Sequence, residues 1–188
     1  IMEVCERQGI DLKSFLLICN VYTYDGYIPS VELMSGADPA TIVDYLHNSH
    51  SFYLLKEFTA LEEELKAMVE PCDATQKKVV ARFFSDYKAQ VENHFEYEES
   101  VVFPYIRALM AGQRYASYSI EQFEENHSNI DETLNDLKNI VMKYLPDTCD
   151  TVLRNQVLYR IYRLGEDLLK HTLIEDNILI PMVNKIEE

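Results

Sequence analysis

A short pattern of three residues occurs twice in this chain and constrains the fold more than any other feature. Each copy has a histidine, a glutamate four residues later and a proline ten residues after the histidine. The two copies are His94, Glu98 and Pro104, and His171, Glu175 and Pro181. On an α-helix, residues i and i+4 lie on one face about one turn apart, so the His and Glu of a copy can reach one metal cluster. The repeat therefore favours a fold of long helices that present these side chains to a shared interior.

A further histidine precedes each copy. His127 lies 44 residues before His171, and His50 lies 44 residues before His94, whereas His47 lies 47 residues before His94. The chain thus reads as two helix pairs of similar design, each with one histidine followed by the His and Glu of the repeat. The equal spacing favours His50 as the upstream residue of the first pair, and His47 remains the alternative.

Apolar residues recur at intervals of three and four over four long segments, which is typical of helices that face a core. The predicted helices span residues 38 to about 69, 74 to about 110, 119 to 146 and about 150 to the C-terminus. The linkers are short, so neighbouring helices should be antiparallel. The sequence therefore predicts an all-α, up-down-up-down four-helix bundle over residues 38–188.

Residues 1–37 differ from the rest and form a second predicted region. Met2–Gln8 and Asp11–Asn20 should be helical with a break at Gly9, and residues 22–36 contain turn signals typical of a loop. The sequence begins at Ile1 rather than at a methionine. We expect this segment to be the end of a truncated N-terminal domain.

All the histidines and both repeat glutamates lie in the apolar stripes that should face the bundle core. A buried ionised carboxylate without a partner is strongly destabilising, and no Arg or Lys lies near the glutamates in those stripes. A pair of divalent cations would neutralise them. Imidazole and carboxylate ligands suit iron, manganese or zinc, and facing helices of a bundle commonly hold dinuclear sites.

Charge and composition exclude several functions. The formal net charge is −15, which argues against binding to nucleic acid or to anionic membrane surfaces. There is no run of eighteen apolar residues, so no membrane span is expected. The cysteines lack the spacing of a zinc finger and fit reduced thiols in the cytoplasm. They are Cys5, Cys19, Cys72 and Cys149.

The segments HNSH, HFEYEESVVFPYI, NHSNIDE and HTLIEDNILIPM resemble the hemerythrin-like (HHE) cation-binding domain over about residues 38–188. Within that group the chain looks most like the di-iron proteins that repair iron centres. The resemblance implies two non-haem iron ions, oxo- or hydroxo-bridged, held by one histidine per helix and two bridging glutamates. The metal ligands that the resemblance implies are His47, His94, Glu98, His127, His171 and Glu175. In the close relatives the first histidine of an H-x-x-H pair is the ligand, which favours His47, whereas the internal spacing favours His50. The expected ligand is therefore His47, and His50 is the alternative.

Two related di-iron groups fit less well. Oxygen-carrying hemerythrins have a second histidine on the third helix, where this chain has Asp131. They pair the fourth-helix histidine with an aspartate five residues later, whereas the partner expected for His171 here is Glu175, four residues later. Ferritin-like oxidases use Glu-x-x-His on two helices, and this chain has one match, from Glu124 to His127. Both departures disfavour a pure oxygen carrier or a ferritin-like oxidase.

The resemblance implies a stress-response function, namely repair of iron–sulfur clusters damaged by nitric oxide or oxidants. The expected partners are small diatomic ligands (oxygen, nitric oxide) and damaged iron–sulfur proteins. Two alternatives remain: a sensor of a diatomic ligand or of iron, and a metal-free helical interaction module. Residues 4–11 resemble the end of the short N-terminal domain of the repair proteins, whose paired cysteines would lie upstream of Ile1.

Overall fold

The computed structural model describes residues 1–113, 118–126, 131–146 and 149–188, with the backbone alone at 125–126 and 131–133. These residues form helices and turns, and no strand occurs among them. The predicted all-α helical bundle is confirmed. No helix in the described part of the chain combines the length and the apolar character that crossing a membrane requires.

The first bundle helix consists of α4 (Pro39–Phe52), the π-helical turn η1 (Tyr53–Glu57) and α5 (Phe58–Met68). It begins where the sequence predicts, because the Asp38 carboxylate accepts hydrogen bonds from the backbone N–H groups of Ala40 and Thr41, at 3.1 and 3.2 Å. Those N–H groups have no partner within the helix, so the cap fixes the start of α4.

The second and fourth bundle helices share one construction, an α-helix, a π-helical turn and a second α-helix. The second consists of α6 (Ala74–Tyr97), η2 (Glu98–Val102) and α7 (Phe103–Met110). The fourth consists of α10 (Thr151–Ile174), η4 (Glu175–Leu179) and α11 (Ile180–Glu187). Asp73 and Asp150 cap the two starts, each accepting two backbone N–H groups.

The π turns were not predicted, and they change which residues face the core. The apolar stripe predicted that Val101 would be buried, but Val101 is half-buried and Val102 is fully buried. A π turn contains one residue more than an α turn, so the buried face moves along the sequence by one position.

The third predicted helix appears as α8 (Ile120–Asn126), α9 (Asp131–Asn139) and the π turn η3 (Ile140–Tyr144). Residues 127–130 lie outside the described part, so a single helix over 119–146 stays a prediction. The backbone N–H of Ile120 donates a hydrogen bond of 2.9 Å to the Glu187 carboxylate, which ties the start of α8 to α11.

The N-terminal segment contains α1 (Met2–Gln8), α2 (Leu12–Thr23) and α3 (Val31–Met34). The prediction for α1 is confirmed. The prediction for α2 ended three residues early, because no breaker occurs before Gly26, which has the positive φ of a turn. The loop predicted over residues 22–36 was wrong in part, because Ser30 caps α3 by accepting the Leu33 N–H at 3.4 Å.

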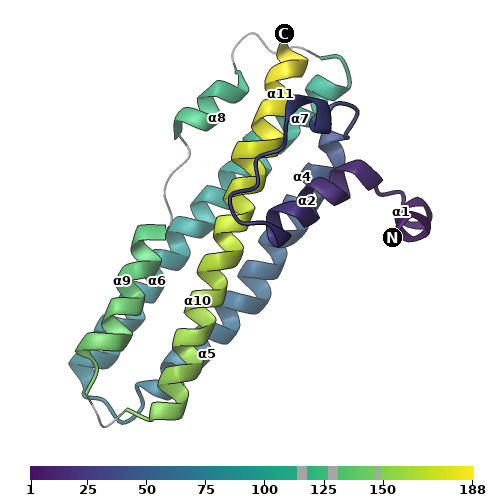
Figure 1. Cartoon of the computed structure of the whole chain (residues 1–188). Coiled ribbons are helices and arrows are strands. Elements are labelled where there is room, and N and C mark those ends of the chain that lie inside the picture. Colours follow the sequence, from purple (N-terminus) through teal and green to yellow (C-terminus); the bar gives the residue numbers. More distant parts are fainter. Residues whose placement is uncertain (114–117, 127–130, 147–148) are drawn as a thin grey trace. The chain divides into compact units, whose positions relative to one another are not determined.

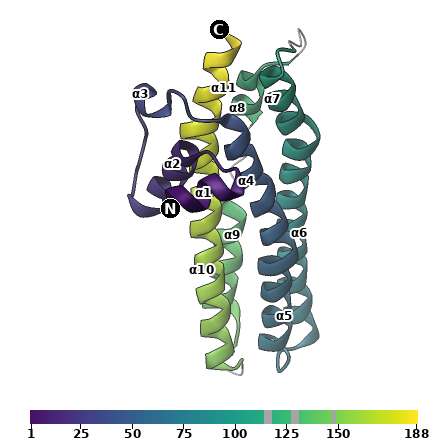
Figure 2. The ribbon, with the colours of Figure 1, turned by 90° about the vertical axis from the view of Figure 1, so that its right-hand side faces the viewer.

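The chain divides into two compact units. Unit 1 comprises residues 1–49, 97–127 and 170–188, and unit 2 comprises residues 50–96 and 128–169. In unit 1, α2 contacts α1 and α3, and α11 contacts α7 and α8 (Figures 1 and 2). The predicted domain boundary between residues 37 and 38 falls inside unit 1 and stays a prediction.

Each unit has its own apolar core. The unit 1 core is built mainly from aliphatic residues of α2, α4, α7, η4 and α11, for example Leu46, Ile106 and Ile178. The unit 2 core is built from α5, α6, α9 and α10 and includes large rings such as Phe58 and Tyr87.

Candidate metal centre

Few polar side chains are buried in the described part of the chain. Apart from Ser14, they are His50, Glu98, His171 and Glu175. The two glutamates have no accessible surface, and the two histidines are 4% and 2% exposed. Acidic residues are rarely fully buried unless they are paired or bind a metal, so the two glutamates and the two histidines are potential metal ligands among the described residues.

Three of these residues form a compact cluster in unit 1. Glu98, His171 and Glu175 each offer one donor atom, and these atoms lie within 4.8 Å of one another. Nε2 of His171 lies 3.0 Å from Oε1 of Glu175. The spacing is short enough for the donor atoms to share one ion or a pair of ions.

Both cluster glutamates occupy the same position in their helices. Glu98 is the first residue of η2, Glu175 is the first residue of η4, and in each case a proline, Pro104 or Pro181, lies in the first turn of the next helix. Proline has no N–H, and its ring clashes with the carbonyl four residues earlier in an ordinary α-helix. A wider turn before the proline relieves that clash, and π turns of this kind often occur at functional sites. The repeated proline thus gives a local reason for the wide turns at the two glutamates, whereas η1 forms without a proline.

The two carboxylates oppose each other's ionisation. The pKa of Glu98 is raised well above its ordinary value, first because burial penalises the charged form. The negative charge of Glu175 and a hydrogen bond with it raise the pKa of Glu98 further, and the charge of Glu99 adds to the effect. Two buried carboxylates in contact become stable as anions when a cation lies between them. The cluster therefore fits a divalent metal.

A serine fixes the orientation of the His171 ring. The Ser49 hydroxyl donates its hydrogen to the Leu46 carbonyl oxygen at 2.7 Å, and Oγ of Ser49 lies 2.9 Å from Nδ1 of His171. When the hydroxyl hydrogen is used in this way, Nδ1 of His171 carries a hydrogen and donates to Ser49, and this is the tautomer in which Nε2 can bind a metal.

The His171 tautomer supports the metal fit. With the hydrogen on Nδ1, a neutral His171 directs the lone pair of Nε2 at the Glu175 carboxylate, which has only lone pairs to offer. The contact is stable when a proton or a cation lies between the two atoms. Histidine ligands of metals usually donate their other ring N–H to a neighbouring group in this way.

The two candidate histidines of α4 have different surroundings. The side chain of His47 is 54% exposed, and its Nδ1 lies 2.8 Å from Oε2 of Glu99. His50 is buried, and its ring stacks on Phe95 within unit 2, with centroids 3.9 Å apart and planes inclined by 14°. Burial thus distinguishes two residues that the sequence left as alternatives.

The other predicted ligands give less information. His94 is half-buried in unit 2, with its ring centroid 5.9 Å from that of Phe95. His127 lies outside the described residues. The sequence did not indicate Ser49 or Glu99 as neighbours of the histidines, and the separation of 122 positions between Ser49 and His171 explains the first omission.

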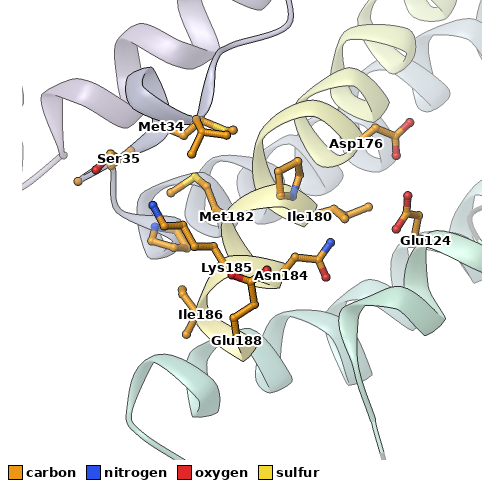
Figure 3. Close-up of a pocket in the computed structure, with 15 residues that line it drawn as sticks. Met34, Ser35, Glu124, Asp176, Ile180, Met182, Asn184, Lys185, Ile186 and Glu188 are labelled. Carbon is orange, nitrogen blue, oxygen red and sulfur yellow. The ribbon is translucent and has the colours of Figure 1, made fainter.

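A separate hollow lies beside α11 in unit 1, with a volume of about 730 Å³. Figure 3 shows Asp176 and Glu124 at one end of this hollow and Met34 at the other. Its described lining contains no histidine or cysteine, so its chemistry differs from that of the buried cluster.

Comparison with known proteins agrees with the site. The hemerythrin HHE cation-binding domain family matches residues 41–183, which contain all the histidines and both repeat glutamates. A curated relative, described as a probable iron-sulfur cluster repair protein of Haemophilus influenzae, is 28% identical over 154 residues, which cover 79% of this chain and 67% of the relative. The family match spans most of the chain, and the protein therefore belongs to the hemerythrin HHE cation-binding domain family.

Proposed function

We propose that this protein is a non-haem di-iron protein that acts in the repair of iron–sulfur clusters damaged by nitric oxide or oxidants. The observation that carries the metal assignment is the buried cluster of Glu98, His171 and Glu175, whose donor atoms lie within 4.8 Å of one another. The repair assignment draws support from the relative described as a probable iron-sulfur cluster repair protein.

The proposed ligands are one histidine from each bundle helix and the two glutamates. They comprise His94, Glu98, His127, His171 and Glu175 together with one histidine of α4. For α4 we propose His50, because it is buried, whereas the exposed His47 already contacts Glu99. The resemblance favours His47, so a paired substitution has to decide between them.

When bound, the metal would supply a change of redox state and a source of exchangeable iron. The protein's own contribution is to hold the ligands and to limit access of water. Ser49 contacts the His171 ring, and Ile174 and Ile178, on the same helix as Glu175, are buried in the apolar core of unit 1. A preorganised site of this kind binds metal without a large rearrangement.

Metal content after reconstitution with iron tests the site. We expect about two iron ions per chain, by the ligand count above. The variant His50→Ala should lose more iron than the variant His47→Ala, which serves as the control on the same helix. Less than half an iron ion per chain in the folded wild-type protein would contradict the di-iron assignment.

Repair activity is tested with an iron–sulfur enzyme inactivated by nitric oxide, with other iron withheld. The iron-loaded protein should restore activity, Glu98→Ala should not, and Glu96→Ala, an exposed glutamate two residues earlier, should behave as wild type. Binding of oxygen or nitric oxide by the iron-loaded protein with no repair would favour the sensor alternative.

A further inference from the structure

Two buried cysteines face each other at one end of unit 2. Cys72 lies between α5 and α6, and Cys149 lies shortly before α10. Their Sγ atoms are 2.7 Å apart although 77 residues separate them in the sequence, and the residues are 8% and 3% exposed. Figure 1 shows that the end of α5 and the starts of α6 and α10 lie at the same end of unit 2.

We propose that Cys72 and Cys149 are a redox modification site that forms a reversible disulfide with a low-molecular-weight disulfide, such as oxidised glutathione, as the oxidant. A disulfide requires an Sγ–Sγ distance of about 2.05 Å, so the sulfurs have to approach by less than ~1 Å. Cysteines that are distant in the sequence meet at this distance only where the fold places them together.

The reaction balances without any further reagent. The Cys72 thiolate attacks one sulfur of oxidised glutathione, the glutathione S–S bond breaks, and the first glutathione leaves as a thiolate that takes up a proton. The Cys149 thiolate then attacks Sγ of Cys72, the mixed disulfide breaks, and the second glutathione leaves. The two cysteines lose two electrons and two protons, and one oxidised glutathione becomes two reduced glutathione molecules.

The surroundings of the pair indicate that the disulfide forms slowly. Burial raises the pKa of Cys72 to about 11, and the hydrogen bond with Cys149 and the charges of Cys149 and Asp73 contribute to the increase. Little thiolate is therefore present at neutral pH, which slows the first attack.

The bond would connect the α5–α6 connection to the segment that leads into α10. A cross-link between residues that are far apart in the sequence restricts the unfolded chain and thereby stabilises the folded one. Cys5 and Cys19 lie in unit 1, on α1 and α2, and provide internal controls.

The experiment equilibrates the full chain in glutathione buffers of increasing oxidised fraction, approached from both the reduced and the oxidised protein. Free thiols are then blocked, and the linked peptides are identified by mass spectrometry. We expect a Cys72–Cys149 link and an increase in melting temperature of roughly 5–10 °C that dithiothreitol reverses.

The variants Cys72→Ala and Cys149→Ser should lose the increase in melting temperature, and Cys19→Ala should keep it. The peptide assay on the wild-type protein needs no variant, so it remains decisive if a substitution prevents folding. The proposal is overturned if both thiols still react with the blocking reagent at the highest oxidised fraction, or if either forms a link with Cys5 or Cys19 instead. Neither result depends on iron binding, so a failure here is distinct from a failure of the proposed function.

Discussion

The cores of the two units contrast in what they bury. The unit 1 core encloses a histidine and two glutamates, which are costly to remove from water. The unit 2 core consists of apolar and aromatic side chains and includes the Cys72–Cys149 pair. The buried His50 is the first residue of unit 2.

The contrast indicates that the two units contribute differently to the stability of the protein and to metal binding. Apolar burial in unit 2 should provide much of the free energy of folding, because large rings such as Phe58 and Tyr87 are fully buried there. The cluster in unit 1 should reduce the stability of the metal-free protein and restore it when metal binds. Proteins commonly accept such a local loss of stability at functional sites.

The largest effect is expected in unit 2, from Phe58→Ala. This substitution should lower the free energy of unfolding by roughly 3–5 kcal/mol, because it leaves a cavity in a fully buried position. The folded fraction should still bind iron with wild-type stoichiometry. Phe52→Ala, at an exposed phenylalanine nearby, should cost less than ~1 kcal/mol in chemical denaturation. An equal loss in both variants would contradict the role given to the unit 2 core.

An intermediate effect is expected in unit 1, from Glu98→Gln, which should weaken iron binding but increase the stability of the metal-free protein. Iron affinity should fall by about 100-fold or more, which corresponds to about 2.7 kcal/mol. The metal-free variant should be more stable than metal-free wild type, because one of two opposed carboxylates becomes neutral. Glu96→Gln is the matched control.

The pH dependence of the metal-free protein tests the same pair. The pKa of Glu98 is raised in the folded state, so the folded state binds its proton more tightly than the unfolded chain does. Raising the pH above about 4.3, the ordinary pKa of glutamate, should therefore lower the free energy of unfolding of metal-free wild type. Glu98→Gln should weaken this dependence. If ionisation of Glu98 with rising pH instead increases the free energy of unfolding of the metal-free wild type, the two carboxylates do not destabilise the folded state.

The smallest effect on iron affinity is expected from Ser49, which contacts the ring of the cluster residue His171. Ser49→Ala removes the acceptor for Nδ1 of His171, and iron affinity should decrease by roughly 10-fold, as for other groups that orient a ligand. Iron titration against a competing chelator measures the change, with Ser51→Ala at an exposed position of the same helix as control. An unchanged affinity would show that the ring is held by other contacts.

Much of the helical architecture could be predicted from local signals. Asp38 and Asp150 accept hydrogen bonds from the backbone N–H groups that begin α4 and α10, so capping and apolar spacing determined those helix starts. The glutamates Glu98 and Glu175 were predicted to be buried, and both are. Such signals are readable because cause and effect lie within a few residues of each other.

Contacts between distant residues could not be predicted. The different burial of His47 and His50, three residues apart on one helix, depends on Glu99 and Phe95 about 45 to 52 positions later in the sequence. The pairing of Cys72 with Cys149 and of Ser49 with His171 is likewise invisible in local patterns. The assignment of the ligand on α4 remains a prediction.

The π turns also determine how this chain can tolerate changes in length. Each π turn that begins at Glu98 or Glu175 contains one residue more than an α-helical turn. A regular helical wheel drawn through residues 74–110 therefore misplaces the residues after Tyr97 by about 100°. Deleting one residue between Glu98 and Pro104 would remove that extra residue and restore the α-helical phase, but the Pro104 ring would then clash with the carbonyl four residues earlier. Substitutions in these turns should therefore be tolerated more readily than insertions or deletions, and related sequences should keep the six-residue interval from glutamate to proline even where the residues between them change.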